Sequence, residues 1–133
     1  MSFELTASMM CANYGHLARE VTELENAGID SFHIDIMDGR FVANFAMSLN
    51  DLSYIAKTTN KPLDVHLMVE HPNNTVELFI RNLRKGDTIY IHPEAEYHPS
   101  ALATYRFFVP HKADTSDRHP PDLPTLQALY LQS

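Results

Sequence analysis

Two histidines and one aspartate occupy positions from which they could bind a divalent metal ion. His33 and Asp35 stand two residues apart in the stretch SFHIDIMDGRF (31–41), and His66 lies in PLDVHLMV (62–69). Along a β-strand, residues i and i+2 point to the same face, about 6.6 Å apart. Imidazole nitrogens and a carboxylate oxygen are ligands that Zn, Fe, Mn or Co accept. The alternative is structural: each histidine is a hydrogen-bonded core residue that partners the buried carboxylate.

These side chains meet only if the chain folds into adjacent strands. Short β-like runs alternate along the sequence with stretches in which apolar residues recur at helical spacing. The expected strands span residues 4–10, 31–37, 62–69 and 87–92, and the expected helices span residues 16–28, 48–59 and 73–86, with a further helix opening in 99–108. A strand–helix–strand order predicts a parallel sheet with crossover helices, which is the α/β class.

Each expected strand has one apolar face and one face that carries polar or sulfur groups. In the second strand, Ile34 and Ile36 share one face. His33, Asp35 and Met37 share the other. An open sheet covered by helices on both sides would need two apolar faces, whereas a barrel interior can hold polar groups. We therefore expect a partial TIM (β/α) barrel of about four parallel strands.

The pattern stops near residue 109. Four prolines, Pro110, Pro120, Pro121 and Pro124, fall within the last 25 residues, where no strand-like run appears. All four glycines precede this stretch. The sequence thus predicts two parts: a half barrel over residues 1–108 and an irregular, proline-rich tail over residues 109–133.

Composition and charge narrow the classes of function. The net charge of −7, with no basic stripe, argues against nucleic acid as a partner. No run approaches the roughly 20 apolar residues of a membrane span. The single cysteine, Cys11, cannot form an internal disulfide, and no signal peptide is visible, so we expect a cytoplasmic protein.

Several motifs, in order and at matching separations, resemble one enzyme family. The motifs ASMMCANY, FHIDIMDGRFVANF, PLDVHLMVEHP and IYIHPE look like those of ribulose-phosphate 3-epimerases and of the related allulose-6-phosphate 3-epimerases, from about Leu5 to about Thr104. The resemblance implies a metal-dependent isomerase that inverts C3 of a ketose phosphate by proton transfer through an enediolate. It also implies an eight-stranded (β/α) barrel, of which this chain would supply four strands.

The resemblance also assigns roles to individual residues. His33, Asp35 and His66 match three ligands of the family's divalent metal ion, and Asp35 matches an acid/base that acts on one face of the sugar. The residues that match substrate-binding positions are Ser8, His66, Met37 and Met68. The expected partner is accordingly a small sugar phosphate.

Two parts of the family pattern have no counterpart in this sequence. The second catalytic aspartate, which is also the fourth metal ligand, lies on a late strand, and the phosphate site lies in glycine-rich loops after the last two strands. We therefore expect an epimerase that is incomplete as a lone chain. The alternative is a non-catalytic truncated fragment, or a half barrel that needs a partner and could form a homo-oligomer. A related decarboxylase is disfavoured, because Asp35 and Asp38 flank Ile36 and Met37 rather than a lysine.

Overall fold

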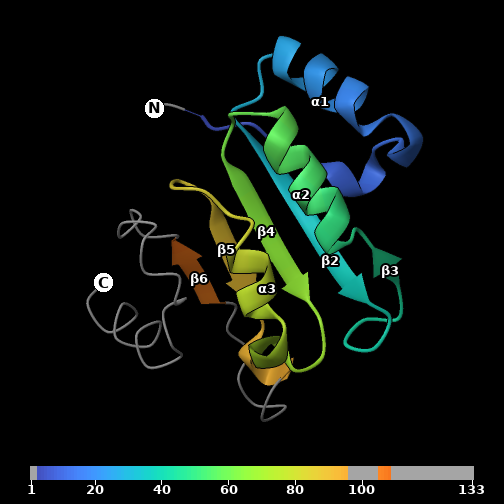
Figure 1. The fold of residues 1–133 in the computed structure, drawn as a ribbon, viewed down its shortest axis with the longest axis vertical. Coiled ribbons are helices and arrows are strands. Elements are labelled where there is room, and N and C mark those ends of the chain that lie inside the picture. Colours follow the sequence, from blue (N-terminus) through green and yellow to red (C-terminus); the bar gives the residue numbers. More distant parts are fainter. Residues whose placement is uncertain (1–2, 96–104, 109–133) are drawn as a thin grey trace.

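The computed structural model describes residues 3–95 and 105–108, which form one sheet with helices packed against it (Figure 1). Four neighbouring strands are parallel and follow the chain in order, as predicted: β1 (Thr6–Ser8), β2 (Ser31–Asp38), β4 (Leu63–Met68) and β5 (Thr88–Ile91). The intervening helices are α1 (Leu17–Asn26), α2 (Leu49–Thr58) and α3 (Val76–Ile80). The α/β class is therefore confirmed, and the arrangement is that of part of a (β/α) barrel.

Four short 3₁₀ turns lie among these elements. They are η1 (Met9–Cys11), η2 (Tyr14–His16), η3 (Pro72–Asn74) and η4 (Pro93–Ala95). Three of them come shortly after the carboxyl end of a strand: η1 follows β1, η3 follows β4 and η4 follows β5. The chain thus turns sharply at the end of the sheet toward which the parallel strands run.

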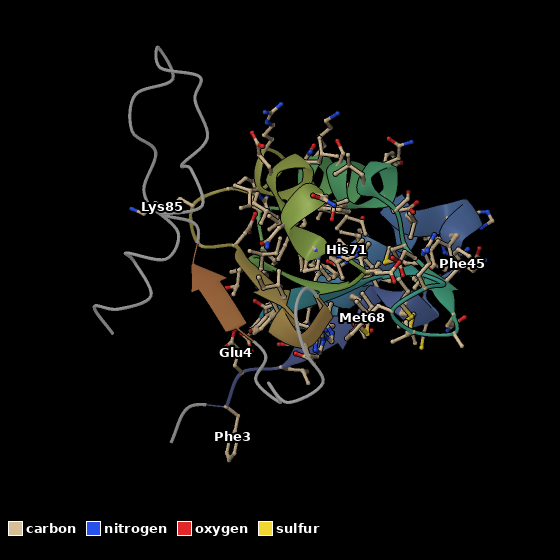
Figure 2. The ribbon with its side chains drawn as sticks, turned by 90° about the horizontal axis from the view of Figure 1, so that it is seen from below. Phe3, Glu4, Phe45, Met68, His71 and Lys85 are labelled. Carbon is tan, nitrogen blue, oxygen red and sulfur yellow. The ribbon has the colours of Figure 1, made fainter. Side chains whose placement is uncertain are left out.

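The hydrophobic core lies between the helices and one face of the sheet. The view from below in Figure 2 shows the α-helices gathered on one side of the strands. On β4, Leu63, Val65 and Leu67 are fully buried, while the alternate residues are only partly buried. Because side chains alternate between faces of a strand, this pattern places the apolar set under the helices and the polar set on the opposite face. The strand faces therefore follow the predicted pattern.

A partly buried ion pair between Arg84 and Asp87 stabilises the starts of β4 and β5. The Asp87 carboxylate, which is 1% exposed as a residue, accepts hydrogen bonds from the backbone N–H of Leu63 (2.9 Å) and of Arg84 (2.7 Å). The Arg84 guanidinium donates to the carbonyl oxygens of Ala56 (3.1 Å), Thr59 and Lys61 (2.8 Å). These contacts connect the end of α2 to the starts of β4 and β5.

Two predicted helices differ from the structure. The helix expected over 73–86 is α-helical only at Val76–Ile80, because a series of tight turns and the Asp87 carboxylate take up the backbone N–H groups that follow. The helix expected to open in 99–108 is wrong at its end, since Tyr105–Phe108 forms strand β6, antiparallel to β5. A short strand β3 (Phe45–Ala46) also pairs antiparallel with β2. The predicted tail at 109–133 lies outside the described residues.

Candidate active site

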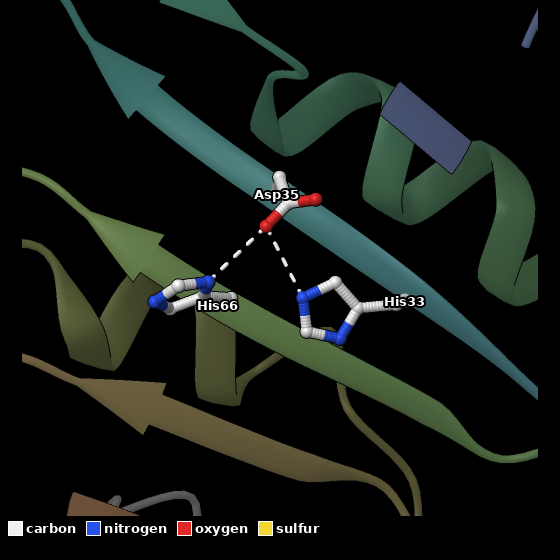
Figure 3. Close-up of side chains that lie close together, drawn as sticks. All are labelled: His33, Asp35 and His66. Atoms are coloured by element: carbon white, nitrogen blue, oxygen red, sulfur yellow. Dashed lines mark hydrogen bonds and ion pairs between the residues drawn. The ribbon is translucent and has the colours of Figure 1, made fainter. Parts of the chain in front are cut away.

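The three predicted ligand residues lie together on the sheet face that the helices leave free. Asp35 of β2 and His66 of β4 are direct partners in the parallel register, and His33 precedes Asp35 by two residues on the same strand. Figure 3 shows the three side chains converging, with both imidazoles directed at the Asp35 carboxylate. Strand pairing alone thus brings together residues that are 31 positions apart in the sequence.

The geometry of this cluster is compact. Asp35 Oδ1 lies 3.1 Å from His33 Nε2 and 3.1 Å from His66 Nδ1. One ligand atom from each of the three residues lies within 4.8 Å of the other two, so a single cation could contact all three. The Asp35 side chain is 12% exposed and those of His33 and His66 are 29% and 24% exposed, so the cluster is shielded but reachable.

Ser8 holds the second oxygen of the same carboxylate. At the end of β1, the Ser8 hydroxyl donates a hydrogen bond of 3.1 Å to Asp35 Oδ2. The register explains this contact, because Ser8 pairs with His33 on the neighbouring strand. The two oxygens of Asp35 therefore have distinct environments: one faces the imidazoles and the other faces a hydroxyl.

Met37 and Met68 lie one register step farther along the same face. They are direct partners across β2 and β4, two residues beyond the Asp35–His66 pair, and both are partly buried. Their thioethers supply an apolar border at the carboxyl ends of these strands. The substrate-binding residues expected from the sequence, Ser8, His66, Met37 and Met68, thus surround Asp35 on one face.

Burial affects the protonation of His66. Burial lowers the pKa of its imidazole below the ordinary 6.5, and the neighbouring His92 and His33 act in the same direction, against the hydrogen bond and charge of Asp35. The neutral ring is therefore favoured near pH 7. A neutral imidazole keeps a nitrogen lone pair, which is the form that coordinates metals.

Two residues just after β5, His92 and Glu94, also belong to this neighbourhood, although they are not among the predicted site residues. His92 Nε2 lies 2.7 Å from His66 Nε2, and His92 Nδ1 lies 2.8 Å from Glu94 Oε1. Burial acts to raise the pKa of Glu94, but hydrogen bonds from the backbone and from His92 outweigh it and hold the pKa below 4.5. The available signal was strand periodicity, which places His92 on the same face as Tyr90.

The turn after β2 is organised by the carboxylate of Asp38. Asp38 Oδ1 accepts hydrogen bonds from the backbone N–H groups of Arg40 (2.9 Å) and Phe41 (3.1 Å). Gly39, between Asp38 and Arg40, has a φ of 72°, in the left-handed region that glycine adopts without strain. This turn follows the strand that carries His33 and Asp35, so it fixes one side of the site opening.

Comparison with known proteins supports the expectation from the motifs. Residues 4–105 match the model of the ribulose-phosphate 3 epimerase family. The chain is 41% identical over 96 residues to ribulose-phosphate 3-epimerase of Methanocaldococcus jannaschii, a match that covers 72% of this chain and 39% of that protein. It is 40% identical over 96 residues to the Helicobacter pylori (strain 26695) enzyme of the same name, covering 72% and 42%. A chloroplastic ribulose-5-phosphate-3-epimerase of Arabidopsis thaliana is 36% identical over 92 residues, covering 69% and 32%.

These matches concern only part of the relatives. The aligned segment is 39% of the archaeal protein and 42% of the Helicobacter pylori protein, so the chain spans about two fifths of the length of these curated relatives. Within the part of the chain that the structure describes, no helix has the length and apolarity needed to span a membrane.

Proposed function

The chain belongs to the ribulose-phosphate 3-epimerase family, and from this membership we propose that its site serves the 3-epimerisation of a ketose phosphate. The substrate would be of the ribulose-phosphate or allulose-6-phosphate type. The observation that carries the proposal is the convergence of His33, Asp35 and His66, whose ligand atoms lie within 4.8 Å of one another inside the matched segment. The proposed metal ligands are these three residues, and the proposed acid/base is Asp35.

The donor set fits a divalent metal ion. Two imidazole nitrogens and one carboxylate oxygen suit Zn, Fe, Mn or Co, and the lowered pKa of His66 keeps its ring in the neutral, coordinating form. Bound there, such an ion would act as a Lewis acid that stabilises negative charge on the oxygens next to C3.

Asp35 would move the proton. A proton next to a carbonyl is removed by a carboxylate held within hydrogen-bond reach of it. The Ser8 hydroxyl, which donates to Asp35 Oδ2, restricts rotation of this carboxylate about its own axis. Met37 and Met68 would border the sugar and keep water away from the reacting carbon.

Inversion at C3 needs a second proton-transfer group on the opposite face of the sugar. The chain spans about two fifths of its curated relatives, and only one carboxylate, Asp35, lies in the cluster of three ligand residues. We therefore propose that the 133-residue chain alone exchanges the C3 proton slowly and epimerises little or not at all. Loss of one positioned acid/base typically lowers a rate by ~10²–10⁴.

A second role follows from the shape of the sheet. The helices cover one face, and the polar face is free of helices within the described residues. A half barrel of this kind could close over a second copy of the chain or another barrel half. Sedimentation measurements of the purified chain distinguish the two roles, because only the second requires a stable complex.

The test of the proposed activity follows two signals from one sample. The full chain is loaded with Zn²⁺ or Mn²⁺ and incubated in deuterated buffer with ribulose 5-phosphate and, separately, allulose 6-phosphate. We expect deuterium uptake at C3 without accumulation of the epimer, and we expect Asp35→Asn to abolish uptake. The control is Asp64→Asn, on the same strand face but outside the cluster. Epimerisation at the rate of a full-length relative would contradict the proposed incompleteness, and no uptake by the loaded chain would contradict the role of Asp35.

A further inference from the structure

A chain of hydrogen-bonding groups leads from His66 away from the proposed metal site. The Nε2 atoms of His66 and His92 are 2.7 Å apart, and the centroids of the two rings are 4.9 Å apart. The His92 ring also packs against the ring of Phe41, with centroids 5.0 Å apart. His92 Nδ1 then reaches Glu94 Oε1 at 2.8 Å. His66 is thus connected at one ring nitrogen to Asp35 and at the other to His92 and Glu94.

The backbone holds Glu94 in this position. Glu94 lies in the turn η4, in which the N–H of Ala95 donates to the carbonyl of His92 at 3.0 Å. The carbonyl of Ala95 in turn accepts from the N–H of His71 at 3.3 Å, which connects this turn to the one after β4. A carboxylate on a turn fixed at two points is suited to orient a partner ring.

The donor and acceptor roles along this chain follow from chemistry. An ionised carboxylate only accepts hydrogen bonds, so His92 carries its proton on Nδ1. In neutral His92 the other nitrogen, Nε2, is then an acceptor, and among the described residues the donor that faces it is Nε2–H of His66. With its proton on Nε2, His66 does not donate to Asp35 Oδ1, 3.1 Å away, and its Nδ1 lone pair can instead bind a metal ion together with that oxygen.

We propose that His92 and Glu94 are positioning residues that fix the tautomer and ring orientation of His66 for metal binding. This inference rests on the proposed metal site. Partners of ligating imidazoles hold the ring and increase its basicity, and their loss typically weakens metal affinity ~10–100-fold. What is specific here is that a second histidine intervenes between the ligand and the carboxylate.

The two oxygens of the Glu94 carboxylate have different environments, since Oε1 faces His92. Its second oxygen, Oε2, is buried and has no hydrogen-bond partner within residues 3–95 and 105–108. Buried polar atoms are usually paired, and leaving one unpaired costs free energy. The contact of the other oxygen, Oε1, with His92 Nδ1 offsets part of that cost.

The experiment measures Zn²⁺ affinity of the full chain by competition with a chromophoric chelator at fixed pH. Glu94→Ala removes the acceptor, Glu94→Gln keeps an amide oxygen as acceptor, and His92→Phe keeps a ring without nitrogens. The control is Glu77→Ala, which removes a carboxylate on α3 that forms an exposed ion pair with Arg81. We expect ~10–100-fold weaker binding for Glu94→Ala and His92→Phe, near-native binding for Glu94→Gln, and no change for Glu77→Ala.

Nuclear magnetic resonance of ¹⁵N-histidine-labelled, Zn²⁺-loaded protein gives a second readout that does not depend on activity. We expect the proton of His92 on Nδ1 and that of His66 on Nε2, with loss of the His92 preference in Glu94→Ala. Equal affinities for all variants, or a Zn²⁺-loaded His92 protonated on Nε2 alone, would overturn the relay while the metal site stands. Failure of the unmodified chain to bind Zn²⁺ would overturn both, and circular dichroism identifies any variant that is unfolded.

Discussion

The carboxylate of Asp38 accepts a hydrogen bond of 2.8 Å from the backbone N–H of Glu70, 32 residues away. The same carboxylate accepts the N–H groups of Arg40 and Phe41 in its own turn. Because one turn follows β2 and the other follows β4, a single side chain connects the loops beyond Met37 and Met68. The loops at the site opening therefore form one hydrogen-bonded unit.

Replacing this carboxylate should destabilise the fold by a moderate amount. Asp38→Ala leaves three backbone N–H groups without their acceptor, and a hydrogen bond to a charged group contributes about 1.5–3 kcal/mol net of the hydrogen bonds exchanged with water. Since the site is partly exposed, we expect a loss of about 1–2 kcal/mol in the free energy of unfolding. Urea denaturation measures it, with Glu70→Gln as control. That variant loses only the exposed ion pair with Arg40, so a loss equal to that of Asp38→Ala would contradict the backbone role.

Stability should fall as the pH falls through the acidic range. Burial acts to raise the pKa of Asp38, but the backbone hydrogen bonds outweigh it and hold the pKa below 3.8. The folded chain then binds fewer protons than the unfolded chain, so the stabilisation is complete above about pH 5 and is lost as the pH falls below it. Glu94, with its pKa below 4.5, acts in the same direction. We expect Asp38→Asn and Glu94→Gln each to flatten the dependence of unfolding free energy on pH between 6 and 3, and unchanged slopes would contradict these assignments.

Among the polar positions tested here, we expect substitution in the Arg84–Asp87 pair to cause the largest loss in the free energy of unfolding. Asp87 is 1% exposed, and Asp87→Ala would leave the backbone N–H groups of Leu63 and Arg84 without their acceptor and the Arg84 guanidinium without its counter-charge. Breaking a buried pair by removing one partner costs about 3–5 kcal/mol. We expect a loss near the lower end of that range, because the Arg84 side chain is 34% exposed. The matched control is Glu77→Ala, an exposed pair with Arg81 worth about 0.5 kcal/mol, and similar losses for both variants would refute this ranking.

Removing both histidines should abolish specific metal binding. His33→Ala with His66→Ala leaves Asp35 as the only member of the three-residue cluster. We expect the purified chain to bind about one equivalent of Zn²⁺, Fe²⁺, Mn²⁺ or Co²⁺ and the double variant to bind none after dialysis. The control is His16→Ala, an exposed histidine on η2. Elemental analysis that finds equal metal in the native chain and the double variant would contradict the site.

Much of the fold was predictable because strand periodicity is local. The alternation of Ile34 and Ile36 with His33 and Asp35 is visible in a few residues, and it determines which side chains share a face. The short α3 was not predictable in the same way, because its early end depends on Asp87, which binds the Arg84 N–H from beyond the helix. Strand β6 was missed since its pairing with β5 is a tertiary contact.

The candidate site shows the same limit. His33, Asp35 and His66 could be grouped from sequence because β2 and β4 are adjacent and in register. Strand periodicity placed His92 on the same face as Tyr90, but its contact with His66 was not predicted, because the proline after His92 indicates a turn and the contact depends on how β5 ends. Glu94 lies in that turn, where no strand or helix period predicts the direction of a side chain.

The antiparallel pairing of β6 with β5 has a kinetic consequence for any assembly of this chain. Residues Tyr105–Phe108 occupy the backbone groups on the outer edge of β5. A further parallel strand, from a second copy or from another barrel half, would need those same groups. Association at this edge is therefore a strand exchange rather than an addition, and its rate at high partner concentration is limited by the unimolecular release of β6. Strand β6 thus competes with any incoming strand for the edge of β5, along which a barrel would be extended.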